Sequence, residues 1–217
     1  MPAVRVTPEL LRVYLVTDPD MPGDLGLVGT CRKAMEAGVR IVQLRDKKAS
    51  TGSLMETAEE LLKATRESSA LLLVNDRVDV AMAAGADGVH LGQDDMPVAD
   101  ARRLLGPEAV IGVSVRTPEE AELARSEGAD YLAANLVFPT DTKTDIPSPL
   151  GLEGVARLRQ STRLPLVAIG GIDHRNAADV VRAGADGVAV VSAIMASDQP
   201  RRAAARLLAA VEGAVGD

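Results

Sequence analysis

Residues 84–90 of the chain read AGADGVH, residues 183–189 read AGADGVA, and related stretches stand at 36–42 (EAGVRIV) and 127–132 (EGADYL). In each stretch a helical pattern ends at a glycine, and an apolar segment begins after a short turn. Glycine suits this position because it readily adopts the left-handed conformation that commonly closes a helix. The recurring pattern therefore predicts a chain built from strand–helix units.

Eight segments are predicted as strands: 13–18, 39–46, 70–76, 88–92, 110–115, 131–137, 165–170 and 187–192. Most are near-continuous aliphatic runs, which are typical of parallel strands buried on both faces. Helical patterns lie between them. The clearest opens with a capping box at 117–120, and an Ala- and Leu-rich helix is predicted over 201–215. The alternation predicts an α/β fold, a single (β/α)8 TIM barrel over 1–217. An open doubly wound sheet is the competing topology.

The composition excludes several classes of partner. The chain has 217 residues, with 24 Lys and Arg against 31 Asp and Glu, so its formal net charge is −7. This charge disfavours non-specific nucleic-acid binding, which needs a basic face. Stacking on single strands is disfavoured too, because the chain has two Tyr, one Phe and no Trp. We therefore expect no nucleic-acid partner.

The sequence also lacks the marks of export or membrane insertion. No apolar run approaches the ~18 residues that can span a bilayer. The first residues carry no basic start followed by an apolar stretch, so no signal peptide is expected. The single Cys31 cannot form an intramolecular disulfide. Together these features predict a cytoplasmic protein with no membrane partner.

The chemistry of a barrel sits at the C-terminal ends of its strands, and the second predicted strand ends in polar residues. Side chains alternate faces along a strand, so Gln43, Arg45 and Lys47 share one face. An amide and two cations at the barrel mouth would suit a diphosphate. The alternative places Arg45 and Lys47 in a solvated loop with Asp46 as their partner.

Carboxylates follow the next two strands. Asp76 ends the third and Asp95 follows the fourth. Two carboxylates together with substrate phosphate oxygens are a usual way to hold Mg²⁺, so this pair predicts a magnesium site. The alternatives are that Asp95 caps the helix that follows it, or that Asp76 pairs with Arg77. Spacing alone leaves Asp94 open as a ligand.

Further polar groups follow the remaining strands. Ser114 ends the fifth, as a mouth hydroxyl or as a turn or capping hydroxyl. The sixth opens into a long loop over 137–145, either a phosphate-contacting lid or a solvated loop. The seventh ends in Gly170-Gly171 and the eighth in Ser192, where this fold commonly binds phosphate. The glycines at the end of the seventh strand and Ser192 at the end of the eighth together predict a second anion site, so two phosphorylated ligands are expected.

The two histidines, His90 and His174, are far apart in sequence and are interpreted as structural.

The ordered motifs resemble the thiamine-phosphate synthase family over essentially the whole chain. They are YLVTD at 14–18, QLRDK at 43–47, ND at 75–76, GQDD at 92–95, Ser114, FPTDTK at 138–143, GG at 170–171 and VS at 191–192. That family has the barrel fold and joins a pyrimidine methyl diphosphate to a thiazole phosphate, or its carboxylated form, giving thiamine phosphate and pyrophosphate. Its members are often dimers, so a homodimer is an expectation.

The resemblance also implies roles for single residues. The residues implied to bind the pyrimidine diphosphate are Gln43, Arg45, Lys47, Asn75, Ser114 and Lys143, of which Arg45, Lys47, Ser114 and Lys143 are the expected catalytic residues. Those implied for the thiazole phosphate are Thr140, Thr142, Gly171, Val191 and Ser192, and Leu44, Asp46 and Asp141 lie within the same substrate-binding motifs. Asp76 and Asp95 are implied to bind Mg²⁺.

One pair of residues departs from the family pattern. Relatives usually carry Gly-Pro before the FPT segment, whereas this chain has Asn135-Leu136. The rival interpretations are a related thiazole tautomerase, a sugar-phosphate epimerase or isomerase, and a catalytically silent binding protein. The tautomerase is expected to lack some of the residues that bind the metal and the diphosphate. The second usually needs an acid–base pair, for which the sequence offers no obvious histidine.

Overall fold

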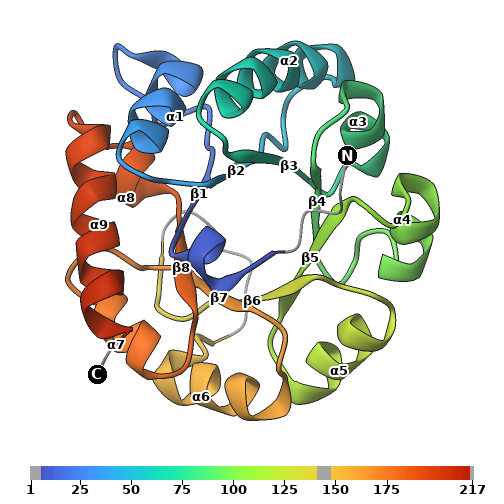
Figure 1. The fold of residues 1–217 in the computed structure, drawn as a ribbon, viewed down its shortest axis with the longest axis vertical. Helices are drawn as coiled ribbons and strands as arrows, with labels where there is room; N and C mark the ends of the chain where they lie inside the picture. Colours follow the sequence, from blue (N-terminus) through green and yellow to red (C-terminus); the bar gives the residue numbers. More distant parts are fainter. Residues whose placement is uncertain (1–5, 141–147, 216–217) are drawn as a thin grey trace.

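A computed structural model describes residues 6–140 and 148–215, and its strands close into a parallel barrel in the order β1 to β8. Helices ring this barrel (Figure 1). The strands are β1 Val13–Val16, β2 Ile41–Leu44, β3 Leu71–Asn75, β4 Gly88–Leu91, β5 Val110–Val115, β6 Tyr131–Asn135, β7 Leu166–Ile169 and β8 Gly187–Val190. Each lies within its predicted segment, and the predicted barrel is confirmed. The open sheet is excluded, because β1 pairs with β8 in parallel.

The helices alternate with the strands. They are α1 Gly26–Glu36, α2 Thr51–Glu67, α3 Val78–Ala84, α4 Val98–Leu105, α5 Pro118–Ser126, α6 Gly151–Ser161, α7 Ala177–Arg182, α8 Ser192–Met195 and α9 Pro200–Ala214. The capping box at the start of α5 is confirmed, since the Thr117 hydroxyl accepts from the Glu120 amide. The predicted last helix is confirmed as α9, and the short α8 precedes it. No helix in the described ranges is long and apolar enough to cross a membrane.

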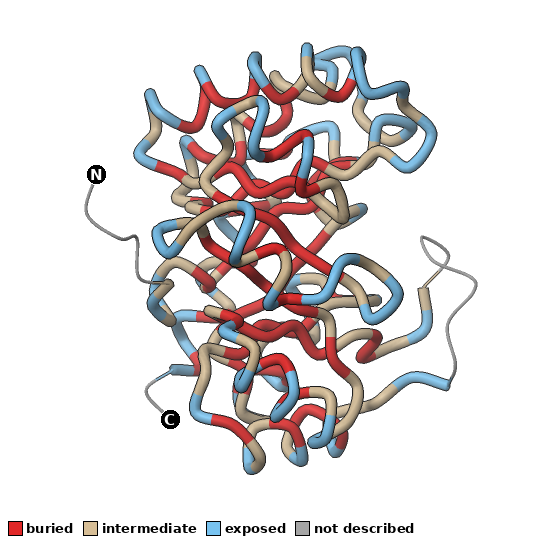
Figure 2. Tube along the Cα trace, turned by 90° about the vertical axis from the view of Figure 1, so that its right-hand side faces the viewer, coloured by how far each residue is buried: buried red, intermediate tan, exposed pale blue. Residues whose placement is uncertain are grey.

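The core has two layers. In Figure 2 the buried residues of both lie along the interior of the molecule. The larger layer lies between the barrel and its helices and is almost wholly aliphatic. The smaller layer fills the barrel and includes Tyr14 and Tyr131. A 3-10 turn over Pro8–Leu11 adds Leu11 to this inner layer and closes the N-terminal end of the barrel. The opposite end, at the strand C-termini, is left for a binding site.

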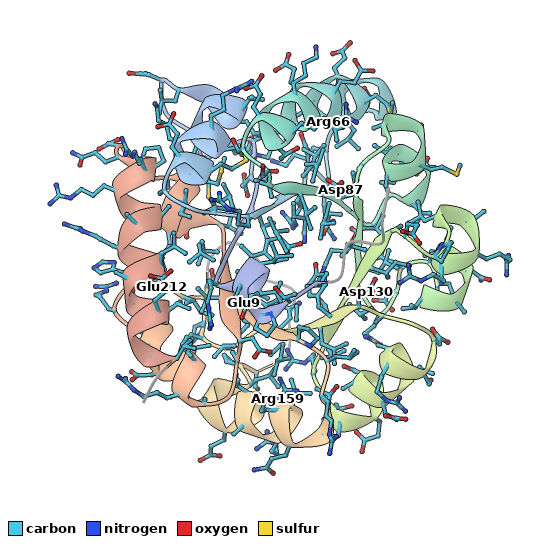
Figure 3. The ribbon with its side chains drawn as sticks, viewed as in Figure 1. Glu9, Arg66, Asp87, Asp130, Arg159 and Glu212 are labelled. Carbon is cyan, nitrogen blue, oxygen red and sulfur yellow. The ribbon has the colours of Figure 1, made fainter. Side chains whose placement is uncertain are left out.

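The repeated GAD motif ties neighbouring strands together. Asp87, Asp130 and Asp186 each accept a hydrogen bond from the first or second backbone amide of a strand: those of Leu72, Ile111 and Leu166, at 2.7–2.8 Å. Arginines from the helices complete two of these contacts, Arg102 with Asp130 at 2.7 Å and Arg159 with Asp186 at 3.2 Å. Figure 3 labels Asp87, Asp130 and Arg159 around the barrel. The sequence repeat that predicts the fold therefore also fastens the starts of the strands.

Candidate active site

A pocket of about 360 Å³ opens at the C-terminal ends of the strands. The predicted site residues that line it are Gln43, Arg45, Asn75, Ser114, Thr140, Gly171, Val191 and Ser192. These residues come from β2, β3, β5 and β6 to β8 or the loops that follow them, so the closed barrel brings together what the sequence separates. Asp141, Thr142 and Lys143 lie outside the described residues.

The end of β2 is held by a buried threonine of the β1 end. The Thr17 hydroxyl donates to the Arg45 carbonyl at 3.2 Å and accepts from the Arg45 amide at 2.9 Å. Thr17 is fully buried, so this contact is shielded from water. It fixes the backbone from which Arg45 reaches the pocket. Sequence reasoning missed Thr17, whose only signal is a hydroxyl at the end of an apolar strand.

Two neighbours of Arg45 point elsewhere. The side chain of Leu44 is buried in the layer between barrel and helices, so only its backbone is near the mouth. The Asp46 carboxylate accepts from the amides of Lys48 and Ala49 at 2.9 and 3.0 Å. Asp46 therefore shapes the turn after β2 and is not the ion-pair partner of Arg45 or Lys47 suggested by the alternative interpretation.

Lys47 and two carboxylates meet beside the pocket. Lys47 Nζ lies 3.5 Å from Asp76 Oδ2. Burial raises the pKa of Asp76, and a hydrogen bond and charge repulsion from Asp95 raise it further, whereas Lys47 lowers it. The Asp95 carboxylate also accepts from the Gly92 amide at 2.7 Å. Asp76 and Asp95 are thus close neighbours, as the topology of consecutive strands predicts.

The other interpretations of these carboxylates find no support in the contacts. Arg77 pairs with Asp79 at 2.6 Å, so it does not neutralise Asp76. The α4 N-terminus has no side-chain cap, so Asp95 is not its capping residue. Asp94 is exposed, whereas Asp95 is half-buried.

The donor chemistry of this pair fits a hard divalent cation. Two carboxylates held side by side repel each other, and a cation between them would remove that repulsion. Mg²⁺ typically takes one or two carboxylates and completes its shell with water and substrate phosphate oxygens. Among residues 6–140 and 148–215 no group of three or more His, Cys, Asp or Glu side chains forms a fuller metal cage. A cation held by this pair would therefore need water or substrate oxygens to complete its coordination.

The chain leaves β6 through the unusual Asn135-Leu136 step, whose peptide bond is cis. Leu136 is buried and lines the pocket. Arg116 spans the two ends of the following loop, donating to the Asn135 carbonyl at 2.8 Å and to the Ser148 carbonyl at 2.7 Å. Arg116 is a second residue that sequence reasoning missed, because its partners lie far away along the chain.

The β7 end is shaped for close approach of the backbone. Gly170 and Gly171 have φ angles of 106° and 63°, which favour glycine. A Cβ on Gly171 would lie 2.5 Å from the Pro139 carbonyl oxygen. Gly171 and Ser192 both line the pocket on the side of β7 and β8. Gly171 and Ser192 thus follow β7 and β8, whereas Lys47 and Asp76 follow β2 and β3, so the two groups of residues stand at different strands of the barrel mouth.

The pocket floor is polar although it lies inside the barrel. Gln43 Nε2 donates to the Tyr14 hydroxyl at 2.6 Å, and the hydroxyls of Tyr14 and Tyr131 are 2.9 Å apart. His90 Nδ1 lies 2.9 Å from the Tyr131 hydroxyl, and its Nε2 lies 3.0 Å from Ser114 Oγ. Burial raises the pKa of both tyrosines, so both are neutral donors and acceptors. Sequence reasoning interpreted His90 as structural and did not include Tyr14 or Tyr131 in the site.

Comparison with known proteins finds one family over most of the chain. The profile of the family described as thiamine monophosphate synthase matches residues 13–194. A thiamine-phosphate synthase of Chloroflexus aurantiacus is 50% identical over 200 residues, which are 92% of each chain. One of Natronomonas pharaonis is 48% identical, over 93% of this chain and 95% of the relative.

A solved structure extends the similarity to three dimensions. The thiamine phosphate pyrophosphorylase of Pyrococcus furiosus superposes with a TM-score of 0.87 at 42% identity, over 96% of this chain and 99% of that one. The family match covers most of the chain, and the relatives match it almost end to end. The chain therefore belongs to the thiamine monophosphate synthase family.

Proposed function

We propose that this chain, a transferase of thiamine biosynthesis, joins 4-amino-2-methyl-5-pyrimidinylmethyl diphosphate to 4-methyl-5-(2-phosphoethyl)thiazole or its carboxylated form. The products are thiamine phosphate and pyrophosphate. The observation that carries the proposal is the pairing of Lys47 with Asp76, which itself lies against Asp95, beside a pocket that Arg45 lines. A cation next to two carboxylates and a second cation is what a diphosphate with a bound metal ion requires.

The first step in the proposal is departure of pyrophosphate. The bond between the pyrimidine CH₂ carbon and the diphosphate oxygen breaks, and its electron pair leaves with that oxygen. The pyrimidine amino group donates electron density to the resulting carbocation. Arg45 and Lys47 stabilise the negative charge that gathers on the leaving group, and Lys143, outside the described residues, is proposed to do the same.

Asp76 and Asp95 are the residues that would hold Mg²⁺. When bound there, the ion would supply further positive charge for the departing pyrophosphate. The two carboxylates themselves fix where that charge is placed, because the amide of Gly92 holds Asp95 and Lys47 holds Asp76.

The second step is attack by the thiazole. Its ring nitrogen has a lone pair and carries no proton, so the new C–N bond forms without a general base. Gly171, Val191 and Ser192 are proposed to bind the thiazole phosphate, with Thr140 and Thr142. Backbone amides near glycine can approach a phosphate closely because no Cβ intervenes. The two ends of the pocket would thus hold both reactants with the reacting atoms between them.

Purified protein incubated with both phosphorylated substrates, with and without Mg²⁺, tests the proposal. Equal amounts of thiamine phosphate and pyrophosphate that depend on Mg²⁺ are expected. Pyrophosphate without thiamine phosphate would overturn the thiazole assignment. Neither product, from protein shown to be folded by circular dichroism, would overturn the synthase reaction and favour the tautomerase or the silent binding protein.

A further inference from the structure

We propose that Gln43, Tyr14, Tyr131, His90 and Ser114 form one directed hydrogen-bond chain through the barrel. The chain couples the donor and acceptor character of the two residues at its ends, both of which line the pocket. Tyr14, Tyr131 and His90 then act as positioning residues that set what Gln43 and Ser114 offer to a ligand. This inference rests on the proposed function only in naming that ligand as an aminopyrimidine.

The direction follows from the number of hydrogens. Gln43 Nε2 carries hydrogens and donates to the Tyr14 oxygen at 2.6 Å. The single Tyr14 hydroxyl hydrogen then has Tyr131 as its partner at 2.9 Å. Tyr131 has in turn used its oxygen as an acceptor, so its own hydrogen goes to His90 Nδ1. Both tyrosines are at most 1% exposed, so no water is at hand for a misdirected hydroxyl.

The histidine carries the direction to the other side of the barrel. Because Nδ1 accepts in this chain, the hydrogen of His90 is on Nε2, which donates it to Ser114 Oγ at 3.0 Å. The Ser114 hydroxyl hydrogen remains for the pocket. At the other end, Gln43 has committed one N–H to Tyr14, and its amide oxygen and second N–H remain for the pocket. The two ends therefore present the amide oxygen of Gln43, beside its second N–H, and a hydroxyl donor at Ser114.

This polarity matches one kind of heterocycle. A 4-aminopyrimidine offers donors on its amino group and acceptors on its ring nitrogens. The corresponding 4-oxopyrimidine offers an acceptor oxygen and a ring N–H, which is the opposite pattern. The oxo oxygen can accept the second N–H of Gln43, but the ring N–H of the oxo compound meets the Ser114 hydroxyl hydrogen unless every bond of the hydrogen-bond chain reverses. The coupling thus penalises the oxo compound at Ser114.

The buried part of the hydrogen-bond chain needs space that a neighbouring side chain would otherwise fill. Gly112 leaves the space that the Tyr131 ring occupies, because a Cβ there would lie 2.0 Å from the ring. Both tyrosines of the sequence, Tyr14 and Tyr131, belong to this hydrogen-bond chain. In the part of the chain that the structure describes, no buried side-chain nitrogen or oxygen lacks a partner. The barrel therefore holds a continuous polar path from Gln43 to Ser114 inside an otherwise apolar inner layer.

The first test measures the His90 tautomer by ¹⁵N NMR of protein labelled at its two histidines, with His174 as the exposed reference. We expect an unprotonated Nδ1 and a protonated Nε2, in the free protein and with 4-amino-5-hydroxymethyl-2-methylpyrimidine bound. A hydrogen on Nδ1 in the complex would overturn the proposal. The free-protein spectrum tests the chain even if the protein forms no thiamine phosphate, so the two failures are distinguishable.

The second test measures the affinities of this amino alcohol and its 4-oxo counterpart by calorimetry. In Tyr131→Phe and in Tyr14→Phe one link is removed, so the amino-to-oxo affinity ratio is expected to fall roughly fivefold in each. Ile169→Val, which trims the pocket wall outside the chain, should weaken both ligands and keep the ratio. An unchanged ratio in both tyrosine variants would overturn the coupling. The tautomer measurement needs no variant and decides even if one of them fails to fold.

Discussion

Lys47 Nζ lies 3.5 Å from Asp76 Oδ2. The next residue, Lys48, forms a different ion pair on the exposed surface, with its Nζ 2.7 Å from Asp20 Oδ2. The two adjacent lysines thus belong to different parts of the molecule. Lys47 faces the carboxylates beside the pocket, whereas Lys48 joins two exposed loops. This gives a matched pair of side chains with which the role of charge at the site can be isolated.

Lys47→Gln should lower kcat/KM by about 10²-fold or more, because it removes a cation from the place where leaving-group charge gathers. Lys48→Gln should stay within about twofold, since exposed ion pairs contribute little. Steady-state pyrophosphate release measures both. Equal losses in the two variants would show that overall positive charge, and not the position of Lys47, matters.

Asp76→Asn should separate activity from stability. The pKa of Asp76 is raised in the folded protein by burial and by Asp95. The folded state therefore holds more protons than the unfolded chain between the ordinary aspartate pKa and the raised one. The free energy of unfolding should fall as pH rises through that window, and this fall should disappear in Asp76→Asn.

The same variant should be at least as stable as the parent at neutral pH, and its Mg²⁺-dependent turnover should be lost. Asp100→Asn, on the exposed face of α4 where it pairs with Arg103, is the control and should keep its activity. Urea unfolding across pH and turnover assays measure the two effects. Retained turnover in Asp76→Asn would remove Asp76 from the proposed magnesium site.

The strand ends show why much of this site is predictable. Arg45, Asp76 and Asp95 interrupt or follow apolar runs, where a charged group is costly unless it has a function. Barrel topology then brings them together, because consecutive strands are neighbours. Tyr14 and Tyr131 are different: within an apolar strand a tyrosine has the pattern of a core residue. Their hydroxyl partners come from other strands, so register across the barrel is needed to see them.

Arg116 illustrates a second limit of the sequence. It stands just after β5 as an ordinary arginine, yet it bonds the carbonyls of Asn135 and Ser148 at 2.8 and 2.7 Å. Backbone carbonyls carry no side-chain signature, so no pattern reveals such partners. The cis Asn135-Leu136 step is likewise invisible, because cis bonds are expected almost only before proline.

Arg116→Ala should lower the free energy of unfolding by about 1–3 kcal/mol, because it leaves two carbonyls without their charged donor. It should also raise the KM for the thiazole phosphate, since the loop it spans contains Thr140, which is proposed to bind that phosphate. Arg103→Ala, which removes an exposed pair with Asp100, should change neither. Thermal unfolding measures the change in stability, and initial rates at varied concentrations of thiazole phosphate measure the change in KM. An unaltered KM would mean that the loop ends hold their places without Arg116.

Gly112→Ala tests the packing around Tyr131. The added Cβ would lie 2.0 Å from the ring, so the ring or β5 must move, at a cost of about 1–3 kcal/mol in unfolding free energy. Gly213→Ala is the control, because nothing lies within 4 Å of its Cβ position in α9, and it should be neutral or stabilising by up to about 1 kcal/mol.

In a Tyr131→Leu background the clashing ring atoms are gone, so Gly112→Ala should then cost much less. Chemical unfolding of the four proteins in this cycle gives the coupling between the two sites. Additive costs would show that the ring of Tyr131 does not occupy the space that Gly112 leaves.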